Sequence, residues 1–380
     1  MYNETTNSQL FITMATIKCV RCGNSYPKNT SLFLCECGGY FDYQEFPKYS
    51  TSNNNQLGVW SYFDSLDLAD HASIVSLGEG GTPLISIQLD SQQLLLKMES
   101  LNPTGSYKDR GSTTLVSHLK ERGIPYAVED SSGNAGASFA AYCAKGSIRC
   151  KVFVPESASG PKRTQIEMFG AELVRIPGPR AEAAKAVINE VKKGVVYGSH
   201  AYMPFGLPGI ATIAYEIVEQ LGEVPSRIIA PVGHGGLLYG IMRGFESMEC
   251  SGFITKQPFY VGVQSENCAP ITRGFESRKL IPEVIEAGET IAEGVKVTNP
   301  VRGEAILSRM QHGKGIMVKV SEIDLRRAYQ QLALLGIYCE PTSALVWAAA
   351  KIGNYEKYAS TVAVITGSGY KSSQNLTGIV

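Results

Sequence analysis

Short apolar runs alternate with amphipathic segments from about residue 77 onward. The runs have the length of buried strands, at residues 93–98, 150–155, 171–177, 227–233, 259–264 and 361–367. Apolar residues at three- and four-residue spacing, or a high alanine content, predict helices at residues 111–123, 135–146, 180–193 and 321–336. Ser321 would cap the last helix at its N-terminus and Gly336 would end it. This alternation predicts an α/β fold, with an open, mostly parallel, twisted sheet and helices on both faces.

The chain before this pattern divides into shorter zones. Residues 1–14 form a polar tail that we expect to be disordered. Residues 15–46 are rich in cysteine and predict a small ribbon. Residues 47–75 form a linker-like segment, which includes a run of serine, asparagine and threonine. The α/β region therefore occupies residues 76–380.

Composition narrows the choice of partners and compartment. The 380 residues include 35 basic and 35 acidic side chains, giving a formal net charge of +0. This balance, with no long run of like charge, argues against nucleic acid or a membrane surface as a partner. No apolar run has membrane-spanning length, and the start lacks the pattern of a secretory signal. The nine cysteines do not form a secreted disulfide pattern, so we expect a reduced, cytoplasmic protein.

Four loops follow predicted strands and lead toward helices or turns, at residues 102–112, 129–138, 231–240 and 365–373. In open α/β sheets, ligands bind at such strand ends. The first loop, NPTGSYKDRGS, carries Lys108, an amine that could act as a nucleophile. A solvated charge on a turn is the alternative interpretation of Lys108.

The third loop is rich in glycine. Gly233, Gly235 and Gly236 would let the backbone approach an anion, and the helix that follows would direct free N–H groups at it. The spacing matches neither an ATP-binding nor a dinucleotide-binding motif. The loop therefore indicates a bound phosphate group that does not belong to ATP or NAD. The alternative interpretation of the glycines is a tight turn between a strand and a helix. An amine and a phosphate cradle at one sheet edge suggest pyridoxal 5'-phosphate, whose aldehyde reacts with lysine.

Several motifs carry a resemblance to a known family. They include SLGEGGTPL, KMESLNPTGSYKDRG, SSGNAGASFAAYCA, MFGAELVRIPG, PVGHGG, EPTSALVWA and ITGSGYK. In these the chain resembles the fold-type II pyridoxal phosphate enzymes, and among them the threonine synthase family most closely. The resemblance implies two sheets in interleaved α/β domains, with the smaller domain at about residues 110–200. It also implies a homodimer.

The resemblance assigns roles to individual residues. Lys108 corresponds to the lysine that forms a Schiff base with the cofactor, and once released it would move the α proton. Asn134 corresponds to the partner of the ring hydroxyl. Thr366, in preference to Ser368, corresponds to the hydroxyl facing the pyridine nitrogen, which would leave that nitrogen largely unprotonated. The phosphate loop would comprise Gly233, His234, Gly235, Gly236 and Leu237. The substrate carboxylate would bind Ser131, Ser132 and Gly133.

The active-site loops depart from the family pattern. Threonine synthases usually read STGNTS where this chain reads SSGNAG, so two hydrogen-bonding side chains are replaced by Ala135 and Gly136. The glycine loop is closer to that of serine/threonine dehydratases. Polar contacts discriminate strongly between substrates, so three reactions stay open: conversion of O-phosphohomoserine and water to threonine and phosphate; replacement or elimination on O-phosphoserine or a related amino acid, as in cysteate synthase; and dehydration of serine or threonine. A catalytically inactive binding protein is the non-enzyme alternative.

Other charged residues have simpler interpretations. Asp109 and Arg110 could pair on the surface, where such a pair contributes little. Lys162, Arg163 and Arg110 are basic residues that could meet a phosphorylated substrate.

Four cysteines lie close together in the sequence. Cys19 and Cys22 are separated by two residues, and Cys35 and Cys37 by one. Four thiolates in a small ribbon predict a closed, structural zinc site. A reduced ribbon without metal is the alternative.

Overall fold

The larger of two main sheets has six strands. The computed structural model describes residues 15–27, 31–52, 56–89, 92–156, 160–178, 180–352 and 360–372. The strand order is β11-β10-β9-β12-β4-β3. The strands are β3 (Leu84–Leu89), β4 (Gln92–Lys97), β9 (Arg227–Pro231), β10 (Phe259–Ser265), β11 (Gly315–Val320) and β12 (Thr361–Val364). Neighbours run parallel from β11 to β4, and the edge strand β3 is antiparallel to β4.

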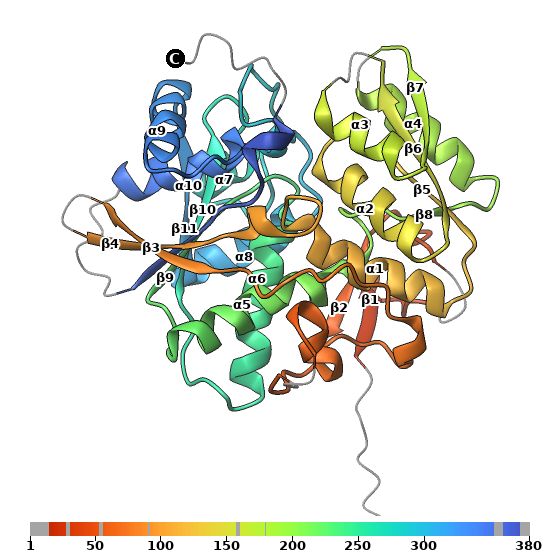
Figure 1. Ribbon diagram of the computed structural model, residues 1–380, viewed down its shortest axis with the longest axis horizontal. Helices are drawn as coiled ribbons and strands as arrows, with labels where there is room; N and C mark the ends of the chain where they lie inside the picture. Colours follow the sequence, from red (N-terminus) through yellow and green to blue (C-terminus); the bar gives the residue numbers. More distant parts are fainter. Residues whose placement is uncertain are drawn as a thin grey trace, which may run out of the picture.

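The second sheet has four strands, all parallel, in the order β7-β6-β5-β8. They are β5 (Tyr126–Glu129), β6 (Arg149–Pro155), β7 (Glu172–Ile176) and β8 (Val196–Tyr197). These strands lie within the range expected for the smaller domain. Figure 1 shows them on the right, beside the larger sheet. Both sheets thus direct the carboxyl ends of parallel strands into loops that can carry ligands.

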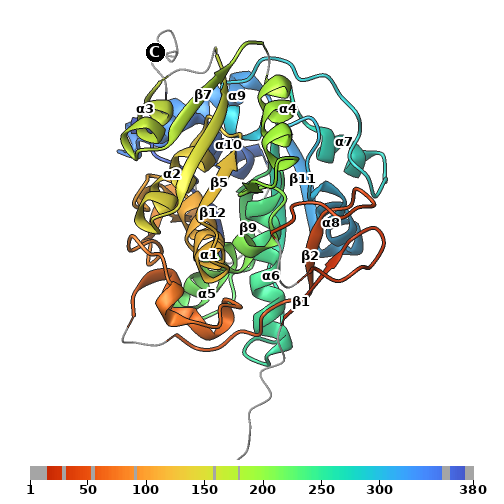
Figure 2. The same ribbon diagram turned by 90° about the vertical axis from the view of Figure 1, so that its right-hand side faces the viewer.

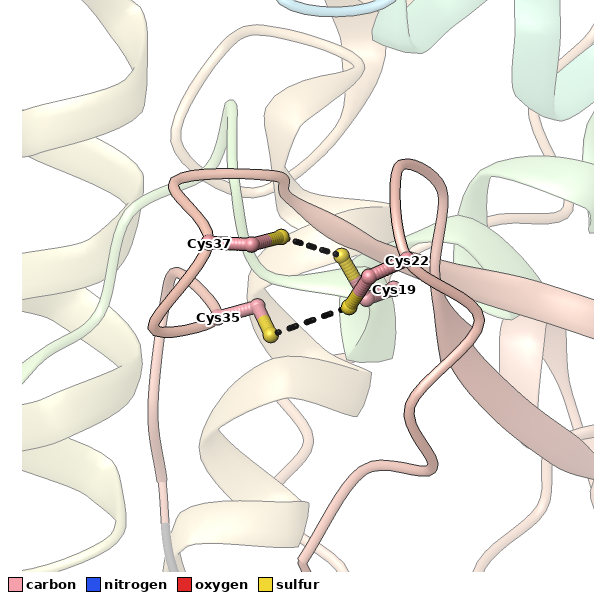
Figure 3. Close-up of side chains that lie close together, drawn as sticks. All are labelled: Cys19, Cys22, Cys35 and Cys37. Atoms are coloured by element: carbon pink, nitrogen blue, oxygen red, sulfur yellow. Dashed lines mark hydrogen bonds between the residues drawn. The ribbon is translucent and has the colours of Figure 1, made fainter.

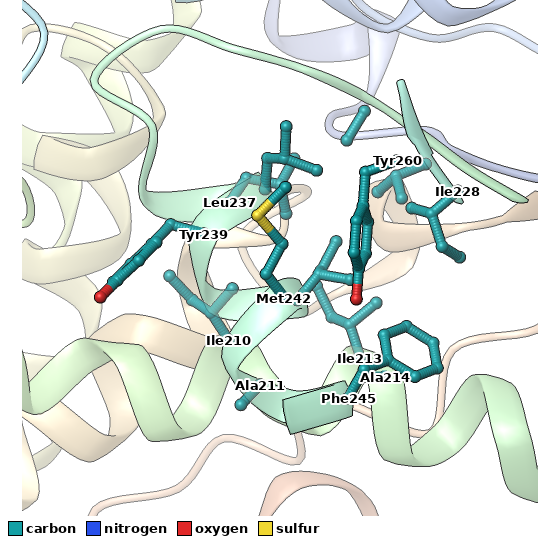
Figure 4. Packing of buried hydrophobic residues seen from close by; sticks show 14 of the residues in the cluster. Ile210, Ala211, Ile213, Ala214, Ile228, Leu237, Tyr239, Met242, Phe245 and Tyr260 are labelled. Atoms are coloured by element: carbon teal, nitrogen blue, oxygen red, sulfur yellow. The ribbon is translucent and has the colours of Figure 1, made fainter. Parts of the chain in front are cut away.

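Helices cover both faces of the larger sheet. The helices are α1 (Lys108–Glu121), α2 (Asn134–Lys145), α3 (Pro161–Met168), α4 (Arg180–Val191), α5 (Leu207–Leu221), α6 (Gly236–Cys250), α7 (Pro270–Glu276), α8 (Gly303–Arg309), α9 (Glu322–Leu334) and α10 (Pro341–Ile352). On β9, Ile228 packs in a core cluster with α5 and α6 (Figure 4), whereas Ile229 packs in another with α9 and α10. Alternate side chains point to opposite faces, so strands covered on both sides are apolar throughout.

The N-terminal ribbon is a two-stranded antiparallel sheet of β1 (Thr16–Cys19) and β2 (Phe41–Glu45). Figure 2 shows it beside α6. There Arg243 Nη1 donates to the carbonyl oxygen of Tyr43 at 2.9 Å. The ring of Tyr26 packs edge-on against Phe205, which belongs to the cluster under α1 and α2. The ribbon therefore contacts the α/β region rather than standing apart from it.

The structure confirms the predicted fold class and adds elements that were not predicted. All six predicted strands and all four predicted helices are present, with bounds shifted by up to three residues. Ser321 caps α9 by accepting a hydrogen bond from the Asp324 N–H. No ranges were predicted for β3, β5, β8 or β11, because they are short or lack a continuous apolar run, although a strand was expected before the loop at residues 129–138. The expected tail at residues 1–14 lies outside the described residues. In the described part of the chain, no helix is both long and apolar enough to cross a bilayer.

Candidate active site

One cavity of about 540 Å³ opens where the carboxyl ends of the two sheets meet. Its walls come from the loops after β4, β5, β8, β9 and β12. Each cofactor or substrate residue predicted from the sequence lines it: Lys108, Ser131, Ser132, Gly133, Asn134, Gly233, His234, Gly235, Gly236, Leu237 and Thr366. The volume suits a small organic ligand. Segments more than two hundred residues apart in the sequence thus form a single site.

Lys108 is the first residue of α1 and is held by the loop before it. The N–H of Tyr107 donates to the carbonyl oxygen of Thr366 at 3.0 Å, and Ser106 pairs with Gly367 in an isolated bridge. Gly105 adopts a left-handed conformation with φ of 83°. Any residue with a side chain would be strained in this conformation. These bonds join the lysine loop to the loop after β12, so the amine of Lys108 faces the cavity from a fixed backbone.

Asp109 locks the same loop from inside. Its carboxylate accepts hydrogen bonds from the N–H and hydroxyl of Thr104 and from the hydroxyl of Ser138 on α2. Burial raises the pKa of Asp109 to about 6, against the lowering effect of the Ser138 and Thr104 hydroxyls. Asp109 is fully buried, so the prediction that it lies on the surface is wrong.

Arg110 is also fully buried, and the predicted surface pairing with Asp109 is wrong for it too. Its guanidinium contacts Glu99 at 2.7 Å and Glu216 at 2.7 Å. Lys97 contacts the same Glu216 at 2.6 Å. We call Lys97, Glu99, Arg110 and Glu216 the buried ion cluster. Arg110 does not line the cavity, so it is not available to a phosphorylated substrate.

The glycine loop leads into the N-terminus of α6. Gly235 precedes this helix with φ of 95°, and no side chain caps the helix. A Cβ on Gly236 would have nothing within 4 Å, so open space lies beside the first turn. Uncapped N–H groups and the helix dipole favour an anion at such a place. The loop has the form of a phosphate cradle.

Asn134 and Thr366 approach one carboxylate from opposite sheets. Asn134 Nδ2 donates to Glu340 Oε2 at 2.8 Å, and the Thr366 hydroxyl donates to Glu340 Oε1 at 2.9 Å. Asn134 Oδ1 is buried without a hydrogen-bond partner among the described residues. Ser368, the alternative to Thr366, accepts a bond from the Tyr370 N–H and is not part of the cavity wall. The structure therefore places Thr366 rather than Ser368 in the site.

Two lysines line the cavity besides Lys108 and Lys296. Lys162 Nζ lies 3.5 Å from Glu340 Oε2. Lys371 is 4% exposed, and its amine has no hydrogen-bond partner in the part of the chain that the structure describes. Burial lowers the pKa of Lys371 to about 8, against the raising effect of Asp109 and Glu340. The site thus contains positive charge that the protein itself only partly neutralises.

Sequence reasoning gave no role to three residues of this wall. Glu340 and Lys371 stand inside quoted motifs, EPTSALVWA and ITGSGYK, but their contacts come from distant segments. His200 follows β8, a strand of two residues that was not predicted. Its Nδ1 lies 2.7 Å from Glu129 Oε1, and its ring is 5.7 Å from that of His234. For Glu340 and Lys371 the only signal in the sequence was their place inside quoted motifs, and for His200 there was none.

The four N-terminal cysteines converge, as Figure 3 shows. Cys19 Sγ lies 3.4 Å from Cys37 Sγ, and Cys22 Sγ lies 3.6 Å from Cys35 Sγ. All four sulfur atoms lie within 4.8 Å of one another. With Zn–S bonds of about 2.3 Å, a tetrahedral zinc site needs sulfur atoms about this close. The donor set and spacing fit a closed zinc site with no position left for a substrate.

Comparisons with known proteins agree on one family. The family model described as "Pyridoxal-phosphate dependent enzyme" matches residues 75–367. A threonine synthase from Methanocaldococcus jannaschii is 35% identical over 376 residues, covering 93% of this chain and 92% of the relative. One from Methanosarcina acetivorans is 32% identical, covering 87% and 85%.

Solved structures share the fold. Maize serine racemase matches with a TM-score of 0.68 at 19% identity, covering 76% of this chain and 88% of its own. A threonine deaminase from T.th. matches with a TM-score of 0.63 at 25% identity, covering 76% and 92%. These two matches leave out about a quarter of this chain.

Proposed function

The chain belongs to the threonine synthase family of pyridoxal-phosphate dependent enzymes, and from that premise we propose that it is a lyase converting O-phosphohomoserine and water to threonine and phosphate. One observation carries this proposal. A single cavity contains the amine of Lys108, the N-terminus of α6 and the lysines Lys162 and Lys371. The cavity thus offers one group for an aldehyde, one for the cofactor phosphate and further positive charge for a phosphorylated substrate.

The residues present fit pyridoxal 5'-phosphate. Lys108 would bond its aldehyde, and Gly233–Leu237 would bind its phosphate. Asn134 would meet its ring hydroxyl, and the unpartnered Oδ1 of this side chain shows spare hydrogen-bonding capacity. Thr366 would meet its ring nitrogen. When bound, the cofactor supplies an electron sink for negative charge at the substrate Cα.

The chain's own groups account for the remaining requirements. The backbone N–H groups and hydroxyls of residues 131–133, at the N-terminus of α2, would hold the substrate carboxylate. The amine of Lys108, once free, would take the proton from Cα and return it. Lys162 and Lys371 would stabilise the negative charge of the leaving phosphate. The rigid loop around Asp109 would keep the Lys108 amine at a constant place during these transfers.

A second candidate is elimination from serine or threonine to a 2-oxo acid. Ala135 lines the cavity where threonine synthases usually have threonine. The loss of this hydroxyl removes a hydrogen bond that a substrate could otherwise use. A replacement or elimination on O-phosphoserine is compatible with the same lysines.

The test begins with cofactor binding. Purified protein supplied with pyridoxal phosphate should show the visible absorbance of the lysine-bound cofactor, and Lys108→Ala should abolish it. Lys145→Ala, which changes an exposed lysine on α2, is the matched control and should keep the band. A band that persists in Lys108→Ala would contradict the assignment of the amine.

Substrate choice needs a separate screen. The protein should release phosphate from O-phosphohomoserine and form threonine in equal amounts. Formation of 2-oxo acids from serine or threonine, without phosphate release from O-phosphohomoserine, would decide for the dehydratase. Phosphate release from O-phosphoserine alone would decide for a paralogue of the cysteate synthase kind.

We also propose a homodimer in the cytoplasm. The dimer rests on the family resemblance. The compartment rests on the sequence, whose nine cysteines do not form a secreted disulfide pattern.

A further inference from the structure

Asp42 on β2 of the N-terminal ribbon forms a buried ion pair with Arg302, the residue that precedes α8 (Figure 2). Asp42 Oδ2 lies 3.0 Å from Arg302 Nη1, and the two residues are 7% and 1% exposed. Asp42 Oδ1 accepts a hydrogen bond from the Tyr43 N–H at 2.7 Å. Removal of one partner from a buried pair leaves the other charge uncompensated, which is costly. The pair therefore fixes the ribbon to the helices of the larger sheet at a defined point.

The guanidinium of Arg302 also lies near two aromatic rings. Its Cζ is 5.2 Å from the ring centre of Tyr40 on the ribbon and 5.6 Å from that of Tyr239 on α6. Both distances allow attraction between a cation and a ring. Arg302 thus connects the ribbon with the helix whose N-terminus forms the phosphate cradle.

The backbone of Arg302 holds the glycine loop. Its N–H donates to the carbonyl oxygen of His234 at 3.0 Å. A Cβ at Gly235 would lie 3.2 Å from Arg302 Cβ and 2.8 Å from Ile306 Cδ1, so the start of α8 packs closely against the loop. Arg302 is not part of the cavity wall. It therefore acts on a ligand through the shape of the loop rather than by contact.

The cysteine cluster lies at the same end of the ribbon as Asp42. Lys18 on β1 pairs with Asp42 on β2, and Cys19 pairs with Phe41. Cys19 is one of the four cysteines whose sulfur atoms converge. The strand that carries Asp42 is therefore held beside the cluster, and the ribbon presents the carboxylate to Arg302 from a fixed backbone.

We infer that the ribbon positions the phosphate group of the cofactor, with Asp42 acting through Arg302 on the glycine loop. Asp42 is a positioning residue, because it fixes the side chain of Arg302 and touches no ligand. Arg302 in turn fixes the backbone at His234 and Gly235. The N–H groups at the start of α6 then meet the phosphate in a constant arrangement. This inference rests on the proposed function, because it takes the glycine loop as the phosphate site.

The test compares pyridoxal phosphate with pyridoxal, which lacks the phosphate group. Protein freed of cofactor is titrated with each ligand, and the absorbance of the lysine-bound form gives the dissociation constant. Asp42→Asn removes the charge but keeps the shape, and it should raise the dissociation constant for pyridoxal phosphate about tenfold. The constant for pyridoxal should not change, because the amine of Lys108 and the contacts to the ring are intact.

Arg302→Met should have the same effect as Asp42→Asn. The double variant should bind pyridoxal phosphate no more weakly than the weaker of the single variants, because both substitutions interrupt one series of contacts. Glu45→Gln is the matched control. Glu45 is an exposed carboxylate on the same strand as Asp42, and its replacement should leave both dissociation constants unchanged.

The possible failures are distinguishable. An unchanged dissociation constant for pyridoxal phosphate in Asp42→Asn would overturn the inference and leave the proposed function standing. Equal weakening of both ligands would also overturn it, because Asp42 would then support the fold in general rather than the phosphate site. If the unchanged protein binds neither ligand, the proposed function and the inference fail together.

Discussion

Two groups of charged residues flank the lysine loop, and they differ in how completely they are paired. In the buried ion cluster, Arg110 contacts Glu99 and Glu216, and Lys97 contacts Glu216. In the cavity wall, Glu340 receives several donors, but the amine of Lys371 has no hydrogen-bond partner among the described residues. One group satisfies its charges internally, whereas the other retains capacity for a ligand.

The difference separates a scaffold from a binding site. A buried charge is tolerated where it is paired and hydrogen-bonded. The buried ion cluster meets this condition and fixes α1 against α5, through Arg110 and Glu216. The cavity wall does not meet this condition, because the ammonium group of Lys371 has no hydrogen-bond partner among the described residues. A positive charge without such a partner suits an anionic ligand. We therefore propose that the unpartnered amine of Lys371 in the cavity wall, rather than charge alone, contributes to substrate binding.

The strongest test of the comparison is Arg110→Met. It leaves Glu99 and Glu216 buried without their main partner, so we expect a loss of about 3–5 kcal/mol in the free energy of unfolding. Chemical denaturation measures this loss. Arg309→Met is the control, because the contact of Arg309 with Glu246 is partly exposed and should contribute at most about 1 kcal/mol. Equal losses in both variants would show that the buried ion cluster is not a scaffold.

The pH dependence of this cluster has a definite sign. Burial alone would raise the pKa of Glu216. The charges of Arg110 and Lys97 outweigh burial and lower this pKa from 4.5 to about 2. A carboxyl with a lowered pKa stabilises the fold above its unfolded value and loses that contribution as the pH falls through its folded value. The stability contributed by Glu216 should therefore be present at pH 5 and disappear toward pH 2. Glu216→Gln should flatten the pH dependence over this range.

The cysteine cluster provides a second test, because its four sulfur atoms also lie close enough together to bind a cation. Cys22→Ser should reduce bound zinc, which metal analysis measures, and should loosen the ribbon. The Tyr26 contact with Phe205 would then be exposed, with a loss of roughly 2–3 kcal/mol. Cys250→Ser, an exposed thiol outside the cluster, should change neither quantity. Protein that retains four free thiols and no zinc after purification with zinc present would contradict the metal assignment.

The sequence predicted the framework of the site better than its electrostatics. The strand ends and the loops at Lys108, Asn134, Gly233 and Thr366 follow from local patterns, because parallel strands bring their carboxyl ends to one edge. The environment of Arg110 does not follow from local pattern. Asp109 and Arg110 are neighbours in sequence, and consecutive residues on a helix face different directions. A surface pair between them was therefore the wrong expectation.

Glu340 shows the other limit of sequence reasoning. Its partner Asn134 is 206 residues away, and no spacing rule connects two such positions. The hydroxyl of Thr366 could be assigned to the cavity from its place after a strand. The direction of its hydrogen depends on a neighbour that only the tertiary structure supplies.

The last variant, Lys371→Met, separates the cavity wall from the buried ion cluster by the sign of its effect on stability. Lys371→Met should increase stability, because it removes an ammonium group that is buried without a hydrogen-bond partner among the described residues. Burial lowers the pKa of Lys371 from 10.5 to about 8. A group with a lowered pKa contributes stability above its unfolded value, and that contribution is lost as the pH falls through its folded value. The gain in Lys371→Met should therefore be full below pH 8 and should vanish by about pH 10.5.

Thermal denaturation over that pH range would measure the gain, with Lys145→Met as the exposed control. The same variant should bind a phosphorylated substrate more weakly, because the anion loses the charge that attracts it. Arg110→Met in the buried ion cluster should not increase stability, because it leaves Glu99 and Glu216 without their main partner. If Lys371→Met destabilised the protein as Arg110→Met does, Lys371 would belong to the scaffold, and the distinction between paired and unpaired charge would not identify the binding site.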